Sequence, residues 1–253
     1  MRTQTILFLL LALWIAGFSF ASEDWPAFRG PNYDGSANSS SFSPEKGNLT
    51  VSWRAKAGSG YSGISVVGRK AVTAFTDGDK DVLAVYDSKS GKELWRYQLS
   101  PKYAGHDGSH DGPIATPAIA NGKVFALSAY GNLIALDLTS GREVWSLDVT
   151  KAGGRAPFYG YTASPLVSNG VVVVQIGGEK GKSIAAFDQN TGEVKWTAGD
   201  DMVNHQSPIV MSIGGKERIV AISDKKMLVV DPSNGQTLLD FDHGGDDAAG
   251  ILV

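Results

Sequence analysis

The feature that most constrains the fold is a nine-residue phrase, D-x-x-x-G-x-x-x-W, that recurs along the chain. It reads DSKSGKELW at 87–95, DLTSGREVW at 137–145 and DQNTGEVKW at 188–196. A fourth copy, DPSNGQTLL at 231–239, has Leu239 in the position of the Trp. Self-similarity at a fixed period of ~20–50 residues indicates a solenoid, a propeller or an array of small units.

Each copy predicts the same local structure. The Asp carboxylate can accept backbone N–H groups just downstream, and the Gly supplies the positive φ of a bulged hairpin turn. A Trp that packs against a neighbouring unit buries ~150–250 Å². We therefore expect a set of structural repeat residues that hold the units together: Asp87, Gly91, Trp95, Asp137, Gly141, Trp145, Asp188, Gly192, Trp196, Asp231 and Gly235.

A second hairpin precedes each phrase. Within residues 115–137, Thr116-Pro117 leads into a short strand, and Asn121-Gly122 forms a two-residue turn into the next. Two hairpins make a four-stranded antiparallel unit of ~40–50 residues, the size of a propeller blade. The fold class predicted is therefore all-β, a β-propeller. A long β-sandwich is the alternative, but it would not need one turn phrase at a fixed period. Complete blades are expected at about 60–99, 113–149, 162–198 and 205–242.

The N-terminus has the pattern of a secretory signal peptide. Residues 6–18 are an uncharged apolar run, and small residues at Ser19 and Ala21 precede a cleavage point. The run is shorter than the ~20 residues that span a bilayer, although an uncleaved anchor is the alternative. We expect a signal peptide at residues 1–21 and a periplasmic or secreted mature protein.

Composition excludes several kinds of site and partner. The chain has no cysteine, which excludes disulfides, thiolate metal sites and a lipidated N-terminal Cys. Its formal net charge is −3. That balance predicts neither nucleic acid nor, after signal cleavage, a membrane as partner.

Two segments suggest that the repeats continue beyond this sequence. Within the N-terminal segment 22–59, residues 51–54 (VSWR) have the pattern of an orphan outer strand of a closing blade. A short stub follows Asp242. We expect about four complete blades of a larger ring; closure as a four-bladed ring is the alternative.

The segment DWPAFRGPNYDGSA at 24–37, the orphan Trp strand and the D-x-x-x-G-x-x-x-W phrases together resemble the PQQ-type, quinoprotein dehydrogenase-like β-propeller repeat family. The resemblance implies an exported protein with a ring of seven or eight blades. That family contains quinoprotein alcohol dehydrogenases and also cofactor-free members, among them an outer-membrane assembly lipoprotein. The lipoprotein's lipidation Cys is absent from this chain.

The resemblance makes PQQ and calcium possible cofactors. The dehydrogenases use a carboxylate and amide calcium site, a catalytic Asp, a Trp platform and, in many members, a vicinal Cys pair. This chain has no Cys, and no Glu…Asn…Asp set can be placed in it, so no catalytic residue and no metal ligand is assigned.

The segment GHDGSHDGP at 105–113 connects the Trp95 strand to the Thr116-Pro117 strand. In propellers such connections crowd one face, around the mouth of the central channel, as would those at 148–164 and 200–208. Polar groups that converge on a concave mouth are the default binding-site hypothesis. The ligand-binding candidates are His106, Asp107, His110, Asp111, Arg155, Tyr159, Tyr161, His205 and Gln206.

Other interpretations of these motifs remain open. The segment at 105–113 can be a structural loop, a ligand-contacting loop or a metal site, and its glycines disfavour the helix that would align two His at i, i+4. GSGYSG at 58–63 fits G-x-G-x-x-G but leads into a strand, which excludes a phosphate site at a helix N-terminus. DGDKD at 77–81 lacks the Gly and Glu of a calcium loop and predicts a hairpin tip. No Ser-His-Asp set is recognisable.

These patterns favour a non-catalytic binding or scaffold module for a protein or a polymer such as a glycan. The alternative is a PQQ- and calcium-dependent quinoprotein oxidoreductase of alcohols or sugars. A hydrolase or lyase on the same scaffold is a third, weaker hypothesis.

Overall fold

The structure, a computed structural model, describes residues 24–37, 47, 50–106, 110–178, 180–203 and 205–244. The predicted signal peptide, Asp107 and all but the first two residues of the stub that follows Asp242 lie outside these residues. Sixteen strands form four antiparallel four-stranded sheets, and within each sheet the strands are adjacent in sequence order. The prediction of an all-β fold built from four propeller-type blades is confirmed.

The strands group into the four blades in sequence order. The first blade comprises β1 Ser65–Val67, β2 Lys70–Asp77, β3 Lys80–Asp87 and β4 Glu93–Pro101. The second comprises β5 Ala118–Ala120, β6 Lys123–Leu127, β7 Asn132–Asp137 and β8 Glu143–Asp148. The third comprises β9 Leu166–Ser168, β10 Val171–Gly178, β11 Lys182–Asp188 and β12 Val194–Ala198. The fourth comprises β13 Ile209–Ile213, β14 Lys216–Ile222, β15 Lys226–Val230 and β16 Thr237–Asp242.

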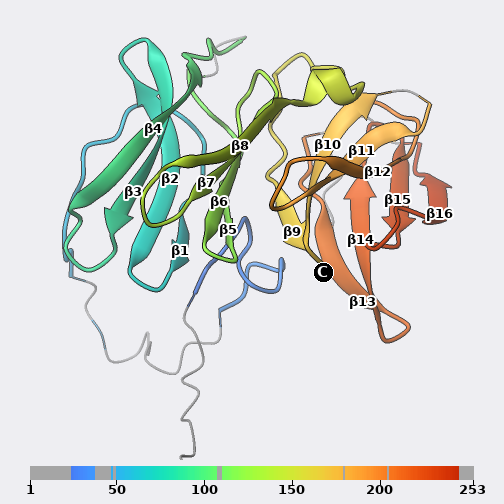
Figure 1. The fold of residues 1–253 in the computed structure, drawn as a ribbon, viewed down its shortest axis with the longest axis horizontal. Coiled ribbons are helices and arrows are strands. Elements are labelled where there is room, and N and C mark those ends of the chain that lie inside the picture. Colours follow the sequence, from blue (N-terminus) through green and yellow to red (C-terminus); the bar gives the residue numbers. More distant parts are fainter. Residues whose placement is uncertain are drawn as a thin grey trace, which may run out of the picture.

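The blades follow one another along an arc (Figure 1), with the first blade at the left and the fourth at the right. The first strand of each blade lies on the inside of the arc and the fourth strand on the outside. Apart from the short 3₁₀ turn η1 (Val149–Ala152), the part of the chain that the structure describes contains no helix, and so none able to cross a membrane.

The repeated phrase forms the same bulged turn in each blade. In the second blade, Asp137 Oδ1 accepts hydrogen bonds from the backbone N of Thr139 (3.2 Å) and of Ser140 (2.7 Å). The Gly141 N–H donates to the Asp137 carbonyl at 2.8 Å, and Gly141 has φ +69°. The ladder shifts register beside this turn, between Ala135 and Leu136. Asp and Gly therefore terminate one strand and start the next, as their chemistry predicts.

Each Trp docks on the turn of the following blade. The indole Nε1 of Trp95 donates to the Leu138 carbonyl (3.1 Å), and that of Trp196 to the Pro232 carbonyl (3.0 Å). The ring lies so close to the Gly of that turn that a Cβ on Gly141 would come within 2.7 Å of Trp95. The turn therefore requires Gly for space as well as for φ.

Trp53 docks on the turn of the first blade in the same way, although the residues around it do not form a strand. Its Nε1 donates to the Ser88 carbonyl at 2.9 Å, and its ring lies against Gly91 in the first blade. Residues 51–54 are not in a strand within the described ranges. The strands expected to pair with them were predicted to follow Val253, so the closing blade stays a prediction. A strand exists only where a partner pairs with it, and within the described ranges these residues pair with no other strand.

Three apolar clusters fill the interfaces between consecutive blades. One joins Leu83 of the first blade to Leu136 of the second, and another joins Phe125 to Val172 across the next interface. The third lies between the third and fourth blades. Strand β10 is buried along its whole length because its alternate residues enter two different clusters, as its continuous apolar sequence predicts.

The N-terminal segment, residues 24–37, runs along the inside of the arc (Figure 1, blue). Trp25 forms a bridge with Val66 of β1, and the Pro26 carbonyl accepts from the backbone N of Ile119 in β5 at 2.7 Å. Tyr33 packs against the cluster between the third and fourth blades. The segment thus contacts all four blades near their innermost strands.

Candidate functional site

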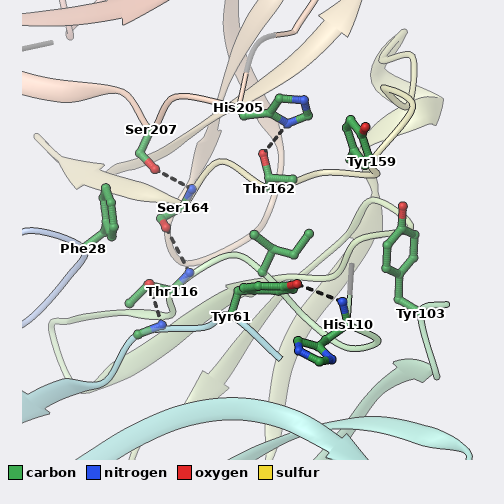
Figure 2. Close-up of a pocket in the computed structure, with 12 residues that line it drawn as sticks. Phe28, Tyr61, Tyr103, His110, Thr116, Tyr159, Thr162, Ser164, His205 and Ser207 are labelled. Atoms are coloured by element: carbon green, nitrogen blue, oxygen red, sulfur yellow. Dashed lines mark hydrogen bonds between the residues drawn. The ribbon is translucent and has the colours of Figure 1, made fainter. Parts of the chain in front are cut away.

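A pocket of about 460 Å³ opens on the inner side of the arc (Figure 2). Most of its lining precedes the innermost strands or lies in the connections between blades, and Phe28 comes from the N-terminal segment. The lining residues are Phe28, Tyr61, Gly63, Tyr103, Ile114, Thr116, His110, Tyr159, Thr162, Ser164, His205 and Ser207.

A chain of hydroxyl groups links the four blades along one side of the pocket. The Gly63 N–H donates to Thr116 Oγ1 (3.0 Å), and the Thr116 N–H donates to Ser164 Oγ (2.9 Å). The Ser164 N–H in turn donates to Ser207 Oγ (2.9 Å), and Figure 2 shows these bonds as dashed lines. In the second, third and fourth blades, the hydroxyl of the Thr or Ser before Pro therefore accepts a hydrogen bond from the backbone that leads into the preceding blade.

Aromatic rings form the other side of the pocket. The Tyr159 ring makes an edge contact with the His205 ring, with centroids 5.5 Å apart. Tyr61 lies beside His110 and its hydroxyl accepts from the His110 backbone N at 2.8 Å. His205 Nδ1 is 2.9 Å from Thr162 Oγ1. The arrangement combines flat apolar surfaces with hydroxyl and imidazole groups.

Tyr103 is held in place by a buried carboxylate. Asp81 is fully buried; its Oδ2 accepts from the Tyr103 backbone N (3.0 Å) and its Oδ1 from Thr76 Oγ1 (2.8 Å). Burial raises the pKa of Asp81, and burial likewise raises the pKa of the Tyr103 phenol. The Tyr103 hydroxyl is buried and has no hydrogen-bond partner among the residues the structure describes.

The structure brings three of the predicted site residues into the pocket: His110, Tyr159 and His205. His106 does not line the pocket but contacts one of its walls: its ring centroid is 6.2 Å from that of Tyr159, and 4.9 Å from that of Phe158. Asp107 is outside the described residues.

The other four predicted residues do not line the pocket. Asp111 stabilises its own loop, because its carboxylate pairs with Lys102 Nζ (2.8 Å) and accepts a hydrogen bond from the Gly105 backbone N (3.0 Å). Tyr161 is buried in the core between the second and third blades, where its hydroxyl donates to the Ile176 carbonyl. The Arg155 backbone N–H donates to the Ile176 carbonyl, and the Gln206 carbonyl accepts from the Gln175 side chain.

Sequence reasoning missed most of the lining. Thr116, Ser164 and Ser207 carried a usable signal, because they are the residues before Pro in the repeated hairpin. Phe28, Tyr61 and Tyr103 carried none, since each belongs to a segment without a repeat pattern and reaches the pocket only through tertiary contacts.

The motif matches have structural explanations. Gly58, Gly60 and Gly63 lie close to neighbouring backbone or side chains, and a Cβ on Gly58 would meet the Thr76 carbonyl oxygen at 1.6 Å. The segment leads into β1, as expected, and DGDKD forms the hairpin tip between β2 and β3. Among the described residues no three His, Asp or Glu side chains are grouped to hold a metal ion.

The lining does not fit the calcium and quinone site of the dehydrogenases. Calcium takes 6–8 oxygen ligands that include carboxylates, and a quinone bearing several carboxylates calls for cationic partners. The described lining contains no Asp, Glu, Lys or Arg, and no Trp platform. No catalytic step through such a cofactor can be derived from these residues.

Comparison with known proteins places the repeats in a family. A family model described as outer membrane protein assembly factor BamB matches residues 78–242. The quinohemoprotein alcohol dehydrogenase ADH IIB of Pseudomonas putida is 34% identical over 135 residues, which are 50% of this chain and 19% of that protein. BamB of Moranella endobia is 24% identical over 165 residues, which are 62% of this chain and 39% of that protein.

A solved structure shares the fold. The quinohemoprotein alcohol dehydrogenase of Comamonas testosteroni superposes with a TM-score of 0.57 at 18% identity, over 87% of this chain and 49% of that one. At this identity the likeness concerns the fold alone. The chain spans half or less of the length of these relatives.

Proposed function

The chain belongs to the family described as outer membrane protein assembly factor BamB, whose repeats are PQQ-like propeller blades, and from this premise we propose that it is an exported, non-catalytic binding or scaffold module for a protein or polymer ligand. The pocket inside the arc is the binding site. Its ligand contacts come from Tyr61, His110, Tyr159 and His205.

The observation that carries the proposal is the chemistry of the lining. Concave sites with apolar walls and a few polar groups are typical of ligand recognition. Here the polar groups are hydroxyls and imidazoles, and the described lining contains neither a carboxylate nor a Lys or Arg. Acid–base work needs a titratable group within reach of the reacting atom. The titratable groups of the described lining are the two imidazoles, of His110 and His205, and the tyrosine phenols. His205 Nδ1 lies 2.9 Å from Thr162 Oγ1.

Export is part of the proposal. The apolar run at 6–18 and the small residues up to Ala21 support a signal peptide, and the family's description refers to the outer membrane. N-terminal sequencing of the protein from the periplasmic or culture fraction tests this. A mature chain that begins at Ser22 supports export, and an intact Met1 in the cytoplasmic fraction contradicts it.

The alternative function is a PQQ- and calcium-dependent quinoprotein oxidoreductase of alcohols or sugars, which the dehydrogenase relatives favour. The full-length gene product, incubated with PQQ and Ca²⁺ and then desalted, distinguishes the two. We expect no retained quinone absorbance band and no dye-linked alcohol oxidation. A retained band together with turnover would overturn the binding-module proposal.

A further inference from the structure

Several hydroxyls in the pocket accept a hydrogen bond but do not donate one to any residue that the structure describes. A Ser or Thr hydroxyl has one O–H donor and two acceptor lone pairs. Thr116, Ser164 and Ser207 each use their oxygen to accept a backbone N–H from the preceding blade. Within the described ranges none of the three donates to an acceptor, and the Tyr61 hydroxyl, which accepts from His110, is in the same situation. The pocket therefore presents a group of unused O–H donors.

Tyr103 adds an independent observation. Its side chain is a pocket wall and only 7% of the residue is exposed, yet its hydroxyl meets no partner among the described residues. A buried hydroxyl that is left unpaired destabilises a fold. Because the ring lines the pocket, a small displacement that brings this hydroxyl to the pocket surface would let a ligand oxygen satisfy it.

The rest of the lining sets the polarity of the ligand. Phe28, Tyr61, Tyr103 and Tyr159 provide aromatic faces, and the described lining carries no Asp, Glu, Lys or Arg. A sugar ring combines apolar C–H faces with a rim of hydroxyls that both donate and accept. Building on the binding function above, we propose that the pocket binds an uncharged saccharide unit of a polymer, with its C–H faces on these rings and its oxygens on the free O–H donors.

A charged sugar fits less well. A uronate carboxylate in this pocket would be partly desolvated with no Lys or Arg among the described lining residues to pair with it, and burying an unpaired charge is costly.

The test is isothermal titration calorimetry of the full chain with a panel of probes. The neutral probes are maltotriose, cellotriose, xylotriose and N,N′,N″-triacetylchitotriose. Trigalacturonate is the charged counterpart, and an acetylated Gly-Tyr-Gly amide is the peptide counterpart. Tyr103→Phe removes only the unpartnered hydroxyl. Tyr130→Phe is the matched control, because its ring contacts Tyr103 but its hydroxyl donates to the Lys102 carbonyl outside the pocket.

We expect at least one neutral oligosaccharide to bind and trigalacturonate to bind more weakly. Tyr103→Phe should weaken that binding about three- to tenfold, the worth of one hydrogen bond, while leaving the free energy of unfolding unchanged or higher. Tyr130→Phe should bind like the wild type. Equal binding of the charged probe, or an affinity that Tyr103→Phe does not change, would overturn the assignment.

Two further outcomes separate this inference from the proposed function. Binding of the peptide but of no oligosaccharide, weakened by Tyr103→Phe, would overturn the saccharide and leave the binding module standing. Retention of PQQ with turnover would overturn both. If no probe in either class bound, the saccharide assignment would be wrong.

Discussion

The indole Nε1 of Trp145 donates a hydrogen bond to the carbonyl oxygen of Gln189, 3.1 Å away, across the boundary between the second and third blades. Trp145 belongs to β8 and Gln189 to the turn after β11, so one side chain joins two sheets. Trp95 and Trp196 make the equivalent bond at the other two boundaries. The regularly spaced Trp residues thus form an equivalent contact at each boundary between blades, which we call the joint.

The first prediction concerns this joint. Trp145→Ala should lower the free energy of unfolding by about 3–5 kcal/mol, because it removes a buried aromatic side chain from a packed interface. Trp145 is 8% exposed and its ring contacts Phe125. Urea unfolding followed by circular dichroism measures the change.

Val144→Ala is the control for Trp145→Ala. Val144 is the preceding residue on the same strand and is 45% exposed, so its truncation should cost within about 0.5 kcal/mol. Similar losses for the two variants would show that Trp145 is not the joint.

The second prediction separates the two reasons for glycine in the repeated turn. Gly141 and Gly122 have nearly the same φ, +69° and +73°, but a Cβ on Gly141 would overlap Trp95 whereas one on Gly122 would meet nothing within 4 Å. Gly122→Ala should cost about 1–2 kcal/mol from the left-handed backbone alone. Gly141→Ala should cost at least about 1 kcal/mol more from overpacking. Equal midpoints in urea would contradict the close approach of Trp95.

The third prediction concerns pH. Hydrogen bonds from the Ser140 side chain and backbone to Asp137 hold the pKa of this carboxyl below its usual value. A carboxyl with a lowered pKa in the folded state stabilises the fold above its unfolded pKa, about 3.9, and this contribution is lost as the pH falls through the folded pKa.

Asp137→Asn is the variant that isolates this effect. The hydrogen bonds that the Asp137 side chain accepts from Thr139 and Ser140 all end on Oδ1, so an Asn can keep the turn while losing the charge. The wild type should be more stable than the variant at neutral pH, and the difference should shrink below about pH 4. Asp79→Asn, on the exposed hairpin tip, is the control. A difference that stays constant from neutral to acid pH would refute the argument.

The fourth prediction concerns the chain of hydroxyls. Ser164→Ala removes the acceptor of the Thr116 N–H, which is buried, and should cost about 1–3 kcal/mol. Hydrogen exchange by NMR should show faster exchange at the Thr116 amide. Ser212→Ala, on an exposed position of β13, should change neither quantity. Unchanged protection of Thr116 would mean that the hydroxyl is not its partner.

The repeated part of the fold was predictable because each blade encodes its own turns. The Asn121-Gly122 and Asn169-Gly170 turns, the Asp and Gly of each phrase, and the continuous burial of β10 all follow from local chemistry. The strand expected at 51–54 stays a prediction. Its sequence suits a strand, and its Trp docks on the first blade, but among the described residues no neighbouring strand supplies the ladder.

The pocket was only half predictable. The convergence of His110, Tyr159 and His205 follows from blade topology, which gathers the connections on one face. The same rule wrongly included Tyr161, because an aromatic residue in a connection can turn into the core instead. Phe28 and Tyr103 depend on where the N-terminal segment and the Asp81-bound loop pack, and no periodic pattern encodes those contacts.

The most direct test of the account is to map the bound ligand by NMR. Backbone amide shifts of the deuterated protein would be followed during titration with whichever neutral oligosaccharide gives the largest heat. The account predicts shifts that cluster at Tyr61, Thr116, Tyr159 and Ser207, residues far apart in sequence that the four blades bring to one pocket. Shifts confined to the exposed outer strand β16, or to a single blade, would contradict it.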